Sequence, residues 1–362
     1  MLSKFNRRKN LFLRNIKTKF IKYIFDKKNK ACFDRNKIKH ILFLRDDDKL
    51  GDMIVSTISF KAAKKSGFTV SVIAGPTTEK IINNNKYVDN IFVYKKGYLN
   101  ACKISHEINL LDNKINLIID VGDELRPETL LLLSLIKNKF LLGFNKKNYM
   151  LYDISLIDNP KDAHHVTFRH KKAMEFLGVN LVDENYHINV PETIEKEVSL
   201  FLNNIGENIL IINPFAASSH RCLSKRQMKE ISTYIHNKYC GMKIIIIGSQ
   251  DKIKNLKIDY AITSPFNTFF HSVALIKNSD FILSPDTSIV HVCQAFNKPL
   301  LALYRKDPIN EEKINSKIWG PNNKNALILF TTEECGDISS IKSESILKTF
   351  NLLIKNHENI HN

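Results

Sequence analysis

Short apolar runs alternate with amphipathic stretches along most of this chain, from residue 40 to residue 305. The runs are rich in Ile, Leu and Val and predict buried strands at residues 41–45, 69–74, 90–94, 116–121, 140–144, 208–213, 243–248, 260–263, 281–284 and 300–304. The stretches between them predict helices at residues 52–66, 77–84, 99–111, 127–137, 224–238, 252–256, 268–278, 287–296 and 343–355. Such alternation is typical of parallel sheets covered on both faces. We therefore predict an α/β protein with two Rossmann-like, doubly wound domains that face a cleft and are joined near residues 185–205.

The first 38 residues follow another pattern, a basic amphipathic arm. Apolar side chains recur on one helical face, and basic ones point elsewhere: Leu13, Ile16, Phe20 and Ile24 against Arg14, Lys19 and Lys22. Residues 1–40 hold 14 Lys and Arg but only Asp26 and Asp34, so +12 of the total charge of +17 lies there and +5 elsewhere. Basic amphipathic helices bind anionic membrane surfaces. We expect this partner and no nucleic acid, because the aromatic residues are not interleaved for base stacking. A helix packed on the body and a disordered tail are the alternatives.

Composition limits the class of protein further. The chain is long enough for two domains, and its 43% apolar and 25% charged residues are ordinary for a globular protein. Six cysteines without a CxxC pair argue against a zinc site or a disulfide framework. No apolar run approaches the about 20 residues that span a bilayer, and the N-terminus lacks the apolar segment of a secretory signal. These observations predict a cytoplasmic protein.

The loop after the first predicted strand is the first candidate for chemistry. It contains three aspartates and then Gly51 and Asp52, with Asp52 expected where the helix begins. Ligands of open α/β sheets bind beyond the carboxyl ends of strands, where a carboxylate can take a proton from a hydroxyl. Helix capping alone would also explain Asp52. Asp46, Asp47 and Asp48 could bind a metal or simply be solvated.

Three further polar turns follow predicted strands of the second half, at residues 213–221, 248–251 and 284–291. In the last of them, Asp286, Thr287 and Ser288 open a helix, whose free amides and dipole favour an anion. Arg221 could neutralise a phosphate, and Asp251 could hold a ribose. Helix caps and a structural role for His291 are the alternatives. The sequence contains no P-loop, no GxGxxG after the first strand and no GxSxG, which disfavours P-loop NTPases, nicotinamide dehydrogenases and common hydrolases.

Several of these segments, in this order and spacing, resemble one family. They are residues 41–45 with Leu50, Gly51 and Asp52, then Asn213-Pro214-Phe215-Ala216, then Asp286-Thr287-Ser288-Ile289-Val290-His291. Over residues 40–305 the chain resembles the heptosyltransferases of glycosyltransferase family nine, which build the inner core of bacterial lipopolysaccharide.

The resemblance implies a GT-B architecture, with an acceptor-binding domain (39–190) and a nucleotide-sugar-binding domain (191–340). The basic arm (1–38) precedes these domains, and a C-terminal helix (341–362) follows them. The resemblance implies inverting transfer from ADP-L-glycero-D-manno-heptose to a lipid-linked core acceptor at the inner face of the bacterial inner membrane, with no cofactor or metal.

The resemblance also assigns residues. Asp52 looks like the general base, and Arg221 takes the place of a family lysine at the donor phosphate. Thr287 and the amides of residues 287–289 would bind the diphosphate, Asp286 would lie near the sugar and His291 near the nucleotide. The implied donor-binding residues are Ser218, Ser219, Arg221, Asp251, Asp286, Thr287, Ser288 and His291, and the implied acceptor-binding residues are Arg45, Asp48 and Lys49.

Four features depart from the family pattern. Ser288 replaces its usual glycine, Arg221-Cys222-Leu223 replaces a Lys-Arg-Trp segment, the loop at residues 45–49 is unusually charged, and the basic arm is additional. Two alternatives therefore stay open: a nucleotide-sugar 2-epimerase of similar fold, and a non-catalytic nucleotide-sugar-binding relative.

Overall fold

The computed structural model describes residues 2–27, 32–123, 125–137, 139–181, 184–307 and 315–361, with side chains described from residue 14 to residue 359. The chain forms two compact units. The first comprises Met1–Asp162 and Val166–Glu184, and the second comprises Ala163–His165 and Asn185–Asn362.

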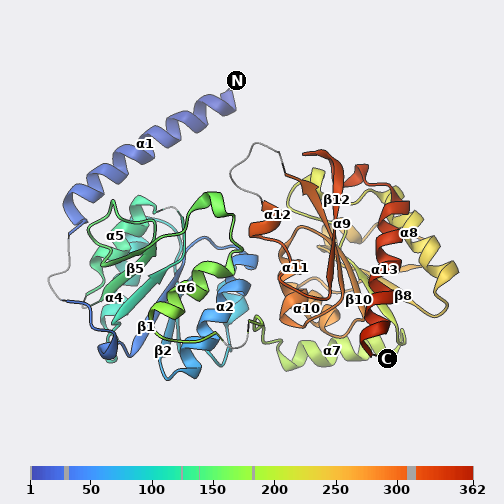
Figure 1. Ribbon diagram of the computed structural model, residues 1–362, viewed down its shortest axis with the longest axis horizontal. Helices are drawn as coiled ribbons and strands as arrows, with labels where there is room; N and C mark the ends of the chain where they lie inside the picture. Colours follow the sequence, from blue (N-terminus) through green and yellow to red (C-terminus); the bar gives the residue numbers. More distant parts are fainter. Residues whose placement is uncertain are drawn as a thin grey trace. The chain divides into compact units, whose positions relative to one another are not determined.

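The first unit is built on a parallel sheet with strand order β3-β2-β1-β4-β5-β6 (Figure 1). Its strands are β1 (His40–Arg45), β2 (Thr69–Ala74), β3 (Asn90–Val93), β4 (Leu117–Asp120), β5 (Phe140–Phe144) and β6 (Ile154–Leu156). Its α-helices are α1 (Leu2–Phe25), α2 (Leu50–Lys65), α3 (Glu79–Ile82), α4 (Tyr98–Asn109), α5 (Pro127–Leu135) and α6 (Thr167–Phe176). The apolar strands β1 and β4 are buried along their whole length, because helices α4 and α5 cover one face and α2 and α6 the other.

The second unit repeats this architecture, with strand order β12-β11-β10-β7-β8-β9. Its strands, all parallel, are β7 (Ile209–Ile212), β8 (Lys243–Ile246), β9 (Ala261–Thr263), β10 (Phe281–Pro285), β11 (Leu300–Lys306) and β12 (Ala326–Glu334). Its α-helices are α7 (Glu192–Asn203), α8 (Lys225–Lys238), α9 (Gln250–Ile253), α10 (Phe269–Lys277), α11 (Ser288–Ala295), α12 (Asn315–Ile318) and α13 (Ser343–His361).

Both sheets have the doubly wound order 3-2-1-4-5-6, counted within each unit. The prediction of two doubly wound, parallel α/β domains is therefore confirmed. In such sheets a crevice opens where the strand order reverses, between the first and fourth strands. A ligand site is therefore expected at the ends of β1 and β4 in the first unit and of β7 and β10 in the second.

The sequence pattern did not predict strands β6 and β12 or helices α6, α7 and α12. Strands β6 and β12 lie at sheet edges, where partial exposure weakens the apolar signal. Helix α6 is rich in polar residues, and α7 lies in the segment that was expected only to join the domains. Helix α7 packs against α10 within the second unit, so this segment is part of a folded layer.

Helix α1 packs on the first unit through its C-terminal end. Ile21 and Phe25 contact the apolar core, and the backbone N–H of Leu151 donates to the Asp26 carboxylate at 2.7 Å. The opposite side of the helix is open: Ile16, Phe20, Tyr23 and Ile24 are 49%, 62%, 90% and 37% exposed. The predicted face thus exists at Ile16, Phe20 and Ile24, whereas the side chain of Leu13 lies outside the described residues.

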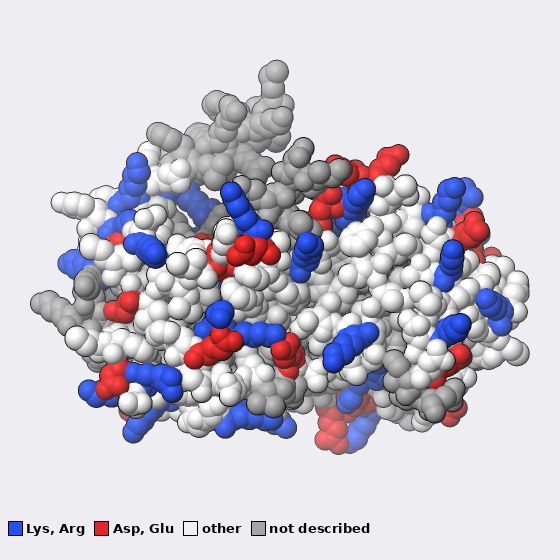
Figure 2. Space-filling view, in the orientation of Figure 1, with Lys and Arg blue, Asp and Glu red and all other residues white. Residues whose placement is uncertain are grey.

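On the face drawn in Figure 2, the charged side chains of the two units show no such concentration, because Lys and Arg lie among Asp and Glu. Among the described helices, none is long and apolar enough to cross a membrane.

Candidate active site

The second unit brings two of the predicted turns together where its strand order reverses. Asn213 directly follows β7, and Asp286 directly follows β10. The side-chain amide of Asn213 donates to Ser284 Oγ at 2.9 Å and to Thr287 Oγ1 at 3.2 Å. Because Asn213 is 6% exposed, these bonds fix the two turns against each other.

Thr287 is the N-cap of α11. Its backbone is extended, and its Oγ1 accepts a hydrogen bond from the Ile289 N–H at 3.2 Å. Ser288, half-buried, is the first residue of the helix. The start of α11 therefore combines a side-chain cap with the positive end of a helix dipole, as an anion site requires.

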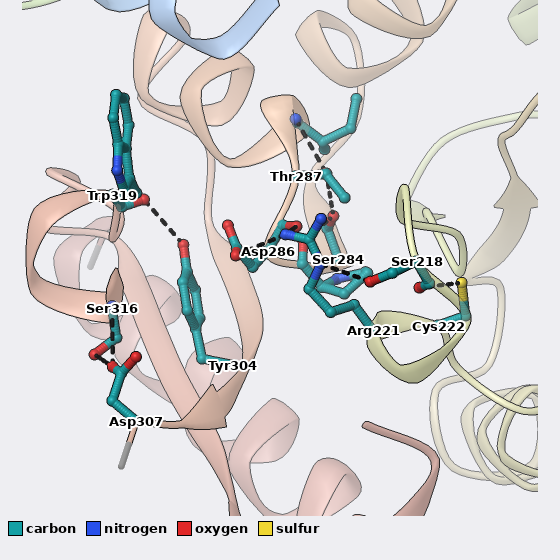
Figure 3. Close-up of polar contacts among 12 residues, drawn as sticks. Ser218, Arg221, Cys222, Ser284, Asp286, Thr287, Tyr304, Asp307, Ser316 and Trp319 are labelled. Carbon is teal, nitrogen blue, oxygen red and sulfur yellow. Dashed lines mark hydrogen bonds and ion pairs between the residues drawn. The ribbon is translucent and has the colours of Figure 1, made fainter. Parts of the chain in front are cut away.

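Arg221 reaches this turn from the loop after β7 (Figure 3). Its Nη1 lies 3.0 Å from Asp286 Oδ2 and also donates to the Asp286 carbonyl at 3.3 Å, while its Nε donates to Ser218 Oγ at 3.2 Å. Burial raises the pKa of the Asp286 carboxyl, and the Arg221 guanidinium opposes this by favouring the charged form. Arg221 is thus held at the start of α11 by a carboxylate for which a ligand phosphate could substitute.

A pocket of about 420 Å³ opens beside this ion pair. Its lining comprises three predicted donor-binding residues and residues from β11 and nearby loops: Ser218, His220, Arg221, Asp286, Tyr304, Arg305, Lys306, Asp307, Ser316 and Cys335. The residues at the end of β11 were not predicted from the sequence, although ligands also bind beyond the carboxyl ends of such strands, which includes residues 305–307.

The other predicted donor residues lie outside this lining. Ser219 is exposed, and so is Asp251 in the first turn of α9. His291 is buried inside the unit, where its ring centroid lies 6.0 Å from that of Tyr186 and 6.3 Å from that of Trp319. Burial, with His165 nearby, lowers the pKa of His291 to about 3, so its imidazole is neutral at physiological pH.

In the first unit, the loop after β1 places Asp52 in an ion pair. Nη2 of Arg45 lies 2.8 Å from Asp52 Oδ1 and 2.8 Å from Asp47 Oδ2. Helix α2 begins at Leu50 with Lys49 as its N-cap, so capping does not explain Asp52, which sits inside the first turn. The alternative reading of Asp52 as a helix cap is therefore wrong.

The three consecutive aspartates of this loop turn to different partners. Asp46 Oδ2 accepts from the Thr129 hydroxyl at 2.6 Å, and Asp47 pairs with Arg45. Asp48 has a left-handed backbone, with φ of 55°, and its Oδ1 accepts from the backbone N–H of Thr77 at 2.8 Å and of Thr78 at 3.0 Å.

This divergence leaves no shared metal position for the three carboxylates. Within the described parts of the chain, no group of three or more His, Cys, Asp or Glu residues could hold a metal ion. Asp48 joins the loops after β1 and β2, while Lys49, the other loop residue assigned to the acceptor, is exposed.

Comparison with known proteins gives one family. The family model described as Glycosyltransferase family 9 (heptosyltransferase) matches residues 105–345. The chain is 28% identical over 353 residues to the Escherichia coli K12 protein named "Putative lipopolysaccharide heptosyltransferase 4", covering 94% of this chain and 95% of the relative.

Two solved structures share the fold. One is the glycosyl transferase family 9 protein from Veillonella parvula DSM 2008, with a TM-score of 0.73, 18% identity, and coverage of 88% of this chain and 97% of that one. The other is the E. coli heptosyltransferase WaaC with ADP, with a TM-score of 0.66, 11% identity, and coverage of 87% and 99%.

Proposed function

The chain belongs to glycosyltransferase family 9, the heptosyltransferase family, and from this premise we propose which sugar it transfers and how. It transfers heptose from ADP-L-glycero-D-manno-heptose to a lipopolysaccharide or lipooligosaccharide core acceptor, with inversion at the anomeric carbon. The family match and the E. coli relative named for lipopolysaccharide support heptose as the sugar. The similar structure solved with ADP supports an ADP-linked donor.

The second unit binds the donor, and the Arg221–Asp286 pair at the start of α11 is the observation that carries this assignment. Breakage of the bond between the anomeric carbon and the diphosphate oxygen leaves an electron pair on the diphosphate. Fixed positive dipoles and a guanidinium stabilise that charge without reorganising. Arg221, Thr287 and the first amides of α11 take this role, and Ser218 holds Arg221 in place.

The remaining donor residues stay proposals with different roles. Ser219 and Ser288 border the phosphate position, and Asp251 binds the ribose. His291 supports the nucleotide position from within, since its ring is packed between Tyr186 and Trp319 rather than lining the pocket.

The first unit binds the acceptor and supplies the base. The acceptor hydroxyl gives its proton to Asp52 as its oxygen bonds to the anomeric carbon and the nucleotide diphosphate departs. Lys49, exposed at the start of α2, contacts the acceptor. Arg45 and Asp48 act from inside the loop, because their charged groups already bind Asp52 and the β2 loop. No metal is needed in this scheme, so we expect EDTA to leave turnover unchanged.

The test is transfer from a panel of nucleotide sugars to truncated lipopolysaccharide cores, read as a mass increase of the acceptor. ADP-heptose should give a product, and Asp52→Ala should lower turnover by about 10²–10⁴-fold while donor affinity stays nearly intact. Asp112→Ala, which removes an exposed carboxylate from the same unit, is the matched control.

Other results would decide against the proposal. Normal turnover of Asp52→Ala would remove the base assignment, and transfer from another nucleotide sugar would change the donor. Release of a rearranged free sugar without any acceptor would restore the epimerase alternative, which the family match disfavours. Tight donor binding without turnover on any core would identify a non-catalytic relative.

We also propose that the enzyme works on the cytoplasmic face of the inner membrane, where its lipid-linked acceptor would be anchored. The support is the local charge of +12 in residues 1–40 together with the exposed apolar side of α1. An interfacial helix of this kind needs both an apolar strip and flanking cations.

A further inference from the structure

Two carboxylates, from the loop between β1 and α2 and from the first turn of α2, contact a single guanidinium nitrogen of Arg45. Nη2 of Arg45 contacts Asp47 Oδ2 and Asp52 Oδ1, each at 2.8 Å. The two carboxylates therefore share one guanidinium. Arg45 comes from the end of β1, Asp52 from the first turn of α2 and Asp47 from the loop between them.

Part of the hydrogen-bonding capacity of the cluster is not used within the described part of the protein. The Arg45 side chain is 8% exposed, and those of Asp47 and Asp52 are 27% and 14% exposed. Nevertheless, Arg45 Nε and Asp47 Oδ1 are buried without a hydrogen-bond partner in the described part of the chain. A buried ion pair stabilises a fold only when its remaining polar atoms are satisfied as well.

The net charge of the cluster, before and after Asp52 takes up a proton, depends on Asp47. With both carboxylates ionised the cluster carries −1, and it becomes neutral when Asp52 takes the acceptor's proton. Without Asp47 the same proton transfer would take the cluster from 0 to +1, which is less favourable in a partly buried site. Arg45 alone would thus hold Asp52 in place but weaken it as a base.

We propose that Asp47 is a positioning residue for the transfer reaction: by sharing Arg45 with Asp52, it lets Arg45 orient the base without weakening it. The inference rests on the proposed role of Asp52. It assigns a function to a carboxylate that the sequence analysis could read only as solvated or metal-binding.

Several other charged groups act on the cluster. Burial raises the pKa of the Asp47 carboxyl, Arg45 opposes the shift, and Asp52 adds to it; Lys49 favours the charged form. Asp46 acts on Arg45 from farther away and is itself bound by Thr129, with Asp120 and Arg126 as its charged neighbours. Asp48 faces the β2 loop.

The experiment compares pH profiles of kcat and KM for five single variants, with ADP-L-glycero-D-manno-heptose and a heptose-deficient lipopolysaccharide core as substrates. In Asp47→Asn, we expect the plateau of kcat to fall about 3- to 10-fold, because the weaker base follows Brønsted behaviour. The pH at which half the activity is lost on the acid side should move down by about one unit, and KM should stay within about twofold.

Arg45→Met should shift the pH dependence in the opposite direction. Without the cation, half the activity should be lost at a higher pH on the acid side, and kcat should fall because the base is no longer held in place. Arg45→Lys keeps the charge and should restore the wild-type pH dependence and part of kcat. The recovery of kcat is partial because an ammonium lacks the planar guanidinium geometry that holds the two carboxylates.

Asp46→Asn is the matched control. It removes the same charge one residue away, and its amide oxygen can still accept from Thr129. The pH at which Asp46→Asn loses half its activity on the acid side should move less than it does in Asp47→Asn. Equal shifts in the two variants, or an Asp47→Asn profile identical to wild type, would refute the shared-guanidinium role.

The experiment distinguishes an error in the base assignment of Asp52 from an error in the role of Asp47. If Asp52→Asn keeps full turnover, the base assignment itself is wrong. If Asp52→Asn is inactive while Asp47→Asn is normal, only the role of Asp47 fails. Circular dichroism and donor binding by calorimetry confirm that each variant is folded before its kinetics are interpreted.

Discussion

Arg221 binds three acceptors through one guanidinium: two atoms of Asp286 just before α11, and Ser218 Oγ in the loop after β7 that also carries Arg221. This arrangement positions a cation before any ligand arrives, so ligand binding need not order it. Replacement of Arg221 should therefore weaken ligand binding more than replacement of an exposed cation does, because Asp286 also loses its counterion.

For Arg221→Met, we expect the dissociation constant for ADP to rise about 10- to 100-fold, the equivalent of about 1.5–3 kcal/mol for a hydrogen bond to a charged group. The fluorescence of Trp319, the only tryptophan, can report binding, because its carbonyl accepts from the hydroxyl of the pocket residue Tyr304 at 3.2 Å. Arg226→Met removes an exposed arginine from the same unit and should leave ADP affinity unchanged. Equal affinities of the two variants would contradict the phosphate role of Arg221.

A buried charge lies in the first unit, at Lys146. This lysine is 2% exposed and places its ammonium 3.4 Å from Asp120 Oδ2, which also accepts from the Tyr152 hydroxyl at 2.6 Å. Replacing Lys146 by Met should destabilise the first unit by about 3–5 kcal/mol, because Asp120 loses its counterion within the core.

Urea unfolding followed by circular dichroism, with hydrogen exchange in β4 and β5, measures this loss. Lys147→Met, at the exposed neighbouring position, should change stability by less than about 0.5 kcal/mol. The double variant Lys146→Met/Asp120→Asn should recover part of the loss, since it removes the unpaired charge. A mild effect of Lys146→Met alone would show that the pair contributes little.

At the scale of the element, α1 combines an anchor and an open strip on opposite sides of one helix. Because Ile21 and Phe25 pack on the core, deleting the arm would also uncover apolar surface of the first unit. Substitutions in the open strip test membrane binding without that disturbance.

The triple variant Ile16→Ser/Phe20→Ser/Tyr23→Ser should weaken binding to vesicles that contain anionic lipid by at least about tenfold, because it removes the apolar area that would enter the interface. Turnover on a short-chain soluble acceptor should stay unchanged. Leu99→Ser/Leu110→Ser/Ile157→Ser replaces equally exposed apolar residues away from α1 and serves as the control. Sedimentation with vesicles at two salt concentrations is the measurement, and equal sedimentation of the two triple variants would contradict the membrane role.

At the scale of the whole molecule, His291 links the stability of the second unit to pH. Its pKa is lowered from 6.5 to about 3 in the folded state, so the unfolded chain binds the proton more tightly. Above pH 6.5, His291 is neutral in both the folded and the unfolded state and does not change the free energy of unfolding. Between pH 6.5 and about 3, protonation of the unfolded chain lowers this free energy by about 1.4 kcal/mol per pH unit.

His291→Phe keeps an aromatic ring against Tyr186 and Trp319 but has no proton to bind. Urea unfolding followed by Trp319 fluorescence at pH 7, 6 and 5 should therefore show a smaller loss of stability on acidification than in the wild type. The control His236→Phe alters an exposed ring of the same unit and should keep the wild-type slope. If His291→Phe loses stability as steeply as the wild type, another group is responsible.

The sequence alone determined the repeating strand–helix architecture, the basic arm and the loops in which to look for a site. These features depend on local periodicity, on charge content and on the rule that ligands gather at strand ends. It also singled out Asp52, Arg221 and Asp286 as residue types suited to proton transfer and phosphate binding.

Only the tertiary structure decided which partner each of these residues takes. The Asn213 bonds to Ser284 and Thr287 span more than 70 positions, and those of Asp48 to Thr77 and Thr78 about 30. Such partners follow from strand order, which brings distant loops to one sheet edge and which no local pattern encodes. For the same reason the sequence could not show that His291 is buried among rings, or that Asp47 and Asp52 share Arg45.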